Sequence, residues 1–178
     1  MTGVDPSQGL WFMGAMAVRN APVGAPPLAP KGRAGDRIEA RCGRAYWQPA
    51  ALTEELEGNR PVKPVRLLGE DLVLFKDEEG RYGLVERHCC HRGADLAFGR
   101  LEDGGLRCPF HGWLFDVAGA CLAQPGEPEG SNFHRKVRQP AYPCVERNGI
   151  VFAYMGPLAE GEAPPAGLGC DCFAAPDA

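Results

Sequence analysis

Short apolar runs, separated by turns rich in Gly, Asp and Asn, fill the middle of the chain. We predict β-strands at these runs because they are brief, rich in Val, Leu, Phe and Tyr, and bounded by turn residues. The predicted strands cover residues 65–68, 72–76, 82–86, 105–107, 113–116, 120–122, 137–141 and 150–154. Short strands joined by tight turns predict an all-β fold, a small antiparallel β-sandwich or barrel.

The flanking regions have a different composition. One short helix is predicted over 49–56, because Pro49 suits a first helical turn and the following residues are good helix formers. Residues 1–35 end in a Pro-, Ala- and Gly-rich stretch that predicts a flexible arm. We therefore expect one folded domain over 36–157 and a tail over 158–178.

Charge and length exclude several classes of protein. The net charge of -4 argues against a nucleic-acid partner, which favours a basic surface. The apolar stretch 9–18 follows no basic residue and is too short to cross a bilayer, so we expect no membrane anchor or export signal. We expect a cytoplasmic protein whose 8 Cys are mostly reduced.

Two pairs of metal-ligand residues occur between 88 and 116, in the sequence HCCHRGADLAFGRLEDGGLRCPFHGWLFD. The pairs are Cys89-x-His91 and Cys108-x-x-His111, so each of two loops offers one thiolate and one imidazole. A Rieske centre needs two sulfur ligands on one iron and two nitrogen ligands on the other. A structural zinc finger instead usually pairs Cys with Cys and His with His. The order of the residues favours iron and sulfide over zinc.

The same segment resembles a known family. Cys-x-His-Arg-Gly followed by Cys-Pro-Phe-His-Gly-Trp is similar to the cluster-binding boxes of Rieske non-haem iron ring-hydroxylating oxygenases. The resemblance covers about residues 43–157 and is to the N-terminal domain of phthalate- and phenoxybenzoate-dioxygenase-like enzymes. Further matching segments are Tyr-Trp-Gln-Pro at 46–49, residues 66–75, Gln-Pro at 124–125 and residues 136–157.

The resemblance implies a cofactor, its ligands and partners. It implies a Rieske-type 2Fe-2S cluster in loops 86–116, within a cluster-binding subdomain inserted into the β-fold. The implied ligands of this metal and cofactor site are Cys89, His91, Cys108 and His111. The implied function is one-electron transfer in aromatic hydrocarbon catabolism. An NAD(P)H-dependent flavin reductase would donate electrons, and an oxygenase catalytic domain or subunit would accept them.

Two positions depart from related proteins. Cys90 stands where the family usually has Pro, and the spacing to His91 selects Cys89 as the ligand. Trp113 stands where respiratory-chain Rieske proteins have a Ser that bonds to a sulfide. Fewer hydrogen bonds to sulfur predict a potential near the bottom of the Rieske range of roughly -150 to +300 mV.

Other reactive residues have ordinary interpretations. We expect His88 to leave a strand and His134 to lie on the surface. We expect Cys42, Cys121 and Cys144 to be small packing residues. A second metal site at Cys170-x-Cys172 lacks further ligands nearby. The acidic residues 77–79 are predicted to form a solvated turn, with attraction of a reductase as the alternative.

A ring-hydroxylating oxygenase also needs a mononuclear iron held by two His and one carboxylate. Only His88 and His134 remain, without the Asp-x2-His-x3-4-His pattern of the family, so we assign no catalytic residue and expect no hydroxylation by this chain alone. The favoured hypothesis is the Rieske part of an oxygenase, ending where the catalytic domain would begin. The alternatives are a free-standing ferredoxin-type carrier and a structural metal-binding module.

Overall fold

The computed structural model describes residues 43–158 and 162–168. The arm predicted over 1–35, the predicted domain start and most of the predicted tail lie outside these residues. The strands are β1 Trp47–Leu52, β2 Val62–Leu67, β3 Glu70–Lys76, β4 Tyr82–Glu86, β5 Arg100–Glu102, β6 Gly105–Arg107, β7 Leu114–Phe115, β8 Cys121–Ala123, β9 Ala141–Tyr142, β10 Cys144–Arg147 and β11 Ile150–Tyr154. Short 3-10 helices are η2 Thr53–Leu56, η3 Leu96–Phe98 and η4 Phe133–Lys136.

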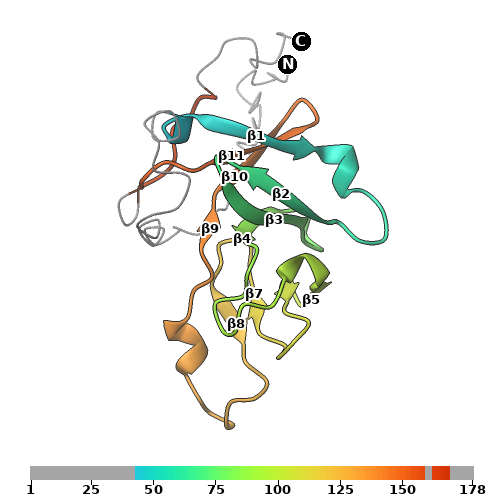
Figure 1. The fold of residues 1–178 in the computed structure, drawn as a ribbon, viewed down its shortest axis with the longest axis vertical. Helices are drawn as coiled ribbons and strands as arrows, with labels where there is room; N and C mark the ends of the chain where they lie inside the picture. The colour runs from blue at the N-terminus through green and yellow to red at the C-terminus, as the bar shows by residue number, and fades with distance from the viewer. Residues whose placement is uncertain (1–42, 159–161, 169–178) are drawn as a thin grey trace, which may run out of the picture.

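The strands form three antiparallel sheets, in the orders β1-β11-β10, β2-β3-β4-β9 and β5-β6-β7-β8. The first two sheets lie together in the upper half of Figure 1, and the third extends below them. The third sheet is inserted in the sequence between β4 and β9, which are themselves paired. This arrangement confirms the predicted all-β antiparallel fold.

The strand β3 is buried on both faces, and this explains its continuous apolar sequence. Leu72 and Leu74 belong to one core, together with Val151 of β11. Val73 and Phe75 belong to a second core, which reaches into the inserted region. Because side chains alternate along a strand, the sheet of β3 is a middle layer between two cores.

The helix predicted over 49–56 is wrong. Residues Trp47–Leu52 form β1 and pair with β11, and only Thr53–Leu56 adopt a 3-10 turn. The register shifts between Pro49 and Ala51, which is where an edge strand tolerates a proline. Pairing with β11 therefore outweighs the local helix propensity of these residues.

Tight turns set most of the strand ends. Asp103-Gly104 and Asn148-Gly149 have positive φ at both residues, as two-residue hairpins of type I′ require. The predicted strands 82–86, 105–107 and 150–154 coincide with β4, β6 and β11. The strands β5 and β10 were not predicted, and β9 begins only at the last residue of the predicted strand 137–141.

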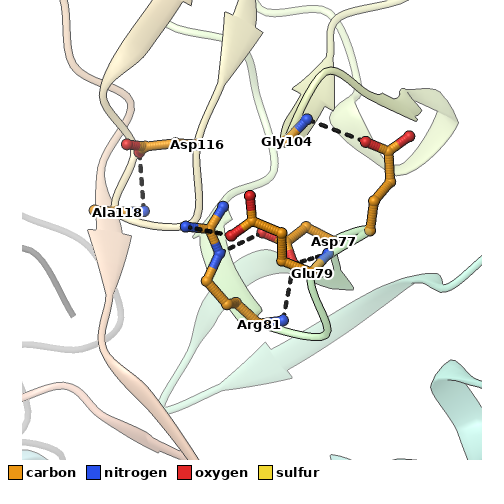
Figure 2. Close-up of polar contacts among 7 residues, drawn as sticks. Asp77, Glu79, Arg81, Gly104, Asp116 and Ala118 are labelled. Carbon is orange, nitrogen blue, oxygen red and sulfur yellow. Dashed lines mark hydrogen bonds and ion pairs between the residues drawn. The ribbon is translucent and has the colours of Figure 1, made fainter. Parts of the chain in front are cut away.

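The predicted solvated turn at residues 77–79 is confirmed for Glu78 and Glu79, which are exposed, and is wrong for Asp77. The Asp77 side chain is fully buried and accepts hydrogen bonds from the Glu79 and Arg81 backbone N–H groups and from Arg81 Nε. Figure 2 shows these contacts, and also the bond from the Gly104 N–H to Glu78 Oε2, 3.3 Å long. The turn thereby fastens the β3–β4 hairpin to the inserted sheet.

No helix within the described residues is long and apolar enough to span a bilayer.

Candidate functional site

The two predicted ligand pairs lie on two loops that share one backbone design. The first follows β4 and runs from Cys89 to Gly93, and the second follows β6 and runs from Cys108 to Gly112. In each loop the glycine N–H donates to the cysteine carbonyl, at 2.8 and 3.1 Å. Both glycines have positive φ, 71° and 72°, a conformation that favours glycine. The Cys-to-His spacing therefore differs between the two boxes, but the turn from cysteine to glycine has the same length in both.

The two cysteine side chains lie inside the fold. Cys89 and Cys108 are each 3% exposed and belong to the core that contains Leu96, Leu106 and Phe115. Burial raises the pKa of Cys108. A hydrogen bond with Cys90, and then burial, raise the pKa of Cys89, whose thiol also contacts that of Cys108. A cation or cluster that displaces the protons would remove this cost of ionising a buried thiol.

The two histidine rings pack against each other, with His91 half-buried and His111 exposed. The His91 and His111 rings are 4.6 Å apart, edge to face, and the Trp113 ring stacks on His91 at 4.2 Å. His111 is exposed beside Phe110, with ring centroids 4.0 Å apart. Burial, together with the charges of His111 and Arg92, lowers the pKa of His91 and so favours the neutral imidazole that binds metals.

The donor set fits a two-iron cluster. Within 43–158 and 162–168, no three His, Cys, Asp or Glu side chains form a group that could hold a single metal ion. The donors lie instead as a sulfur pair and a nitrogen pair, which suits two ligands for each of two irons. His91 Nδ1 is buried without a hydrogen-bond partner in the described part of the chain, as a nitrogen reserved for a metal would be.

The first loop is held by residues that the motif did not reveal. The Arg87 guanidinium donates to Asp95 Oδ2 at 2.6 Å, closing the loop at its base. This contact lowers the pKa of Asp95. The Gln139 side chain bonds to the other edge of the same segment. Arg87 and Asp95 flank the first box, so their sequence positions offered a signal, whereas Gln139 lies far away and offered none.

The second loop is held by Arg107, another residue that the motif did not reveal. Its Nη1 donates to the Gly112 carbonyl at 2.8 Å and its Nη2 to Asp103 at 2.9 Å. Its Nε bonds to Glu102. A cation directly before Cys108 was the available signal. The guanidinium thus ties the end of the loop to the β5–β6 hairpin.

The remaining predicted residues lie mostly as expected. His88 is exposed just beyond β4, and His134 lies half-buried on η4. Cys121 is buried and Cys144 half-buried, in agreement with packing roles. Cys90 is exposed next to the candidate ligand Cys89. The residues Cys42, Cys170 and Cys172 lie outside the described part of the chain.

Relatives share this domain. The phenoxybenzoate dioxygenase subunit alpha of Ectopseudomonas oleovorans is 56% identical over 114 residues, which are 64% of this chain and 27% of that protein. The 5,5'-dehydrodivanillate O-demethylase oxygenase subunit of a Sphingobium species is 51% identical over 125 residues, 68% of this chain and 29% of that protein. This chain therefore spans less than a third of the length of these relatives.

A solved structure has the same fold. The reduced complex between oxygenase and ferredoxin in carbazole 1,9a-dioxygenase matches with a TM-score of 0.58 and 25% identity, over 70% of this chain and 31% of that chain. The family model of the Rieske [2Fe-2S] domain matches residues 46–143, more than half of the chain. The resemblance to oxygenase domains and the predicted cofactor are thereby confirmed. The chain belongs to the Rieske [2Fe-2S] domain family, and the relatives that it matches are oxygenase subunits.

Proposed function

We propose that this chain is the electron-transfer part of an aromatic ring-hydroxylating oxygenase, with Cys89, His91, Cys108 and His111 as the cluster ligands. The observation that carries the ligand assignment is the arrangement of two buried thiols in contact and two imidazoles 4.6 Å apart. The names of the relatives support the assignment to an oxygenase.

The bound cluster supplies reversible uptake and release of one electron. The chain's own residues would shield the cluster from water on the cysteine side and leave the histidine side open to solvent. The cysteines sit in the apolar core, where water is excluded, and would bind as thiolates after losing their protons. His91 would bind through Nδ1, its buried nitrogen without a partner in the described residues. An electron would leave the cluster through the exposed side chain of His111.

The partners follow from the family. We propose that an NAD(P)H-dependent flavin reductase supplies the electron, directly or through a ferredoxin of the kind seen with the carbazole oxygenase. The acceptor would be a catalytic domain or subunit with a mononuclear iron. A cytoplasmic location stays a prediction from the sequence.

Spectroscopy of the purified chain tests the cluster and its ligands. After reduction with dithionite, we expect the visible bleaching and the rhombic EPR signal of a Rieske centre. The replacements Cys89→Ser, Cys108→Ser, His91→Ala and His111→Ala should each remove the signal, whereas His134→Ala should keep it. A colourless, EPR-silent protein that contains zinc would contradict the proposal.

The DNA beyond the Ala178 codon tests the assignment to an oxygenase. A continuing frame that encodes Asp-x2-His-x3-4-His would support it. A stop codon at this point in the gene, together with efficient electron delivery to a separate acceptor, would favour a free-standing carrier.

A further inference from the structure

Beyond β4 the chain bends at Arg87, forms an isolated β-bridge at His88 and enters a turn at Cys90, and its backbone polar groups point to two edges. On one edge, the Arg87 carbonyl accepts from the Leu96 N–H at 2.8 Å. On the same edge, the Cys89 N–H donates to the Ala94 carbonyl at 2.9 Å. This edge is therefore paired with ordinary backbone from the far side of the loop.

On the opposite edge, the Glu86 N–H donates to the Pro140 carbonyl at 2.8 Å, and the remaining partner of this edge is a single side chain. Gln139 Nε2 donates to the Glu86 and His88 carbonyls, both at 2.8 Å. Gln139 Oε1 accepts from the Cys90 N–H, also at 2.8 Å. The next residue, Pro140, has no N–H to offer this edge. The Gln139 amide therefore replaces a strand partner where β9 no longer provides one.

The position of Gln139 is itself fixed. The residue is 1% exposed, and its N–H donates to the Gly119 carbonyl at 2.8 Å. A Cβ at position 119 would lie 2.0 Å from the Gln139 carbonyl oxygen, and Gly119 has a φ of +77°. Only glycine allows this approach. The turn between β7 and β8 thus holds Gln139 against the first ligand loop.

This edge determines which of two adjacent thiols faces the core. The two thiols contact each other, and a shift of the segment by one residue would bring Cys90 to the position that Cys89 occupies. Here Cys89 is buried, and Cys90 is exposed. The bond from the Cys90 N–H to Gln139 resists such a shift, because a slipped segment would lose all three bonds to the amide.

We propose that Gln139 is a positioning residue that selects Cys89 over Cys90 as the cluster ligand. The inference rests on the proposed ligand set. The Cys89 and Cys90 variants distinguish an error in the ligand set from an error in the role of Gln139. The hydrogen bonds of the Gln139 side chain go to backbone groups of residues 86, 88 and 90, so Gln139 acts through the backbone of this segment.

The first test leaves Gln139 intact. In Cys89→Ser, we expect iron per purified chain to fall about tenfold, as for the loss of a ligand or of the groups that orient it, because Cys90 is held outside. If Cys89→Ser keeps its iron and Cys89→Ser/Cys90→Ser loses it, the selection by Gln139 is overturned but a cysteine ligand on this loop stands. If the double variant also keeps its iron, the ligand set itself is wrong.

The second test removes the hydrogen bonds between the Gln139 side chain and the backbone of residues 86–90. Gln139→Leu fills a similar volume and makes no hydrogen bond. In Cys89→Ser/Gln139→Leu we expect iron to recover several-fold over Cys89→Ser, with an EPR signal shifted from the wild type. Adding Cys90→Ser should abolish the recovery. No recovery in a variant with native far-UV circular dichroism would overturn the inference.

A conservative variant completes the design. Gln139→Glu keeps the acceptor for the Cys90 N–H, so Cys89→Ser/Gln139→Glu should recover less iron than the leucine variant. Equal recovery would contradict a role for this bond. The first test does not depend on any Gln139 variant folding, so it can overturn the inference even if these proteins are unstable.

Discussion

At the scale of single residues, the site separates buried sulfur from exposed nitrogen. Cys89 and Cys108 are core residues, and their thiols lie where an unpaired charge would be costly. His111 is exposed, and the His91 ring is covered on one face by Trp113. A cluster held in this way has its sulfur ligands shielded from water and its nitrogen ligands available to a partner.

The potential of the cluster should lie near the bottom of the Rieske range. Trp113 stands where respiratory-chain Rieske proteins have a serine that bonds to a sulfide, and its ring stacks on His91. We expect a midpoint of about -150 mV. An EPR-monitored redox titration measures it, and a midpoint well above zero would show that other groups bond to the sulfides.

Ionised Asp95 should stabilise the first loop in a pH-dependent way. The contact with Arg87 lowers the pKa of Asp95 below its ordinary value of 3.8. The stabilisation is therefore complete above pH 3.8 and disappears as pH falls through the lower folded-state pKa. Asp95→Asn should lower Tm by a few degrees at pH 7, and its difference from wild type should shrink near pH 3.

Circular dichroism melts at several pH values measure this effect. Glu79→Gln, which removes an exposed ion-pair partner, is the control and should change Tm little. A difference between wild type and Asp95→Asn that stays constant down to pH 3 would contradict the role of the charge.

At the scale of elements, each ligand loop is a copy of one turn mounted on a strand end. The loop after β4 is closed by Gly93 and the loop after β6 by Gly112, with nearly the same φ. Neighbouring elements then fix each loop: Arg107 ties the second loop to the β5–β6 hairpin, and Gln139 holds the first. The loops are therefore preformed by bonds that do not involve the cluster.

Gly93→Ala should impair cluster binding, whereas Gly130→Ala should not. Both glycines have positive φ, 71° and 84°, and a Cβ at either position would meet open space, so alanine adds strain and no clash. The strain is about 1 kcal/mol in each case. Because only Gly93 closes a ligand loop, only its variant should show reduced iron and an altered EPR signal. Equal iron loss in both variants would contradict this explanation.

At the scale of the whole molecule, the middle sheet joins two separate cores. One core faces β1, β10 and β11, and the other contains the candidate ligands. A half-buried polar contact ties the layers together: the Glu70 carboxylate bonds to Arg44, before β1, and accepts from Tyr142 Oη at 2.6 Å. Figure 1 shows the sheets that these residues connect. Burial raises the pKa of Tyr142, so its hydroxyl stays protonated and donates.

Glu70→Ala should destabilise the whole domain without changing the cluster. It leaves the Arg44 guanidinium and the Tyr142 hydroxyl without their common partner, at a cost of about 3 kcal/mol. We expect Tm to fall by at least about 10 °C, with an unchanged EPR signal in the protein that remains folded. The exposed carboxylate of Glu129 gives the control, Glu129→Gln. A Tm within a degree of wild type would show that the contact adds no stability.

The sequence alone determined the chemistry and the fold class. The spacing of Cys and His in the two boxes, with a glycine after each, predicted the cofactor, because ligand type and spacing are local properties of a short segment. The strands 82–86, 105–107 and 150–154 were also predictable, because apolar side chains and turn residues mark their ends. Asp103-Gly104 and Asn148-Gly149 carry their turn type in their own residues.

Only the tertiary structure decided what depends on distant partners. Residues 49–56 have helical propensity, yet β11 pairs with this segment and makes it mainly a strand. The sequence pattern groups Asp77 with two further solvated acids, but the fold buries its side chain against Arg81. Gln139 has no local signal because its bonds reach residues about fifty positions away. Interactions of this kind are fixed by the path of the whole chain, and no short stretch of sequence specifies them.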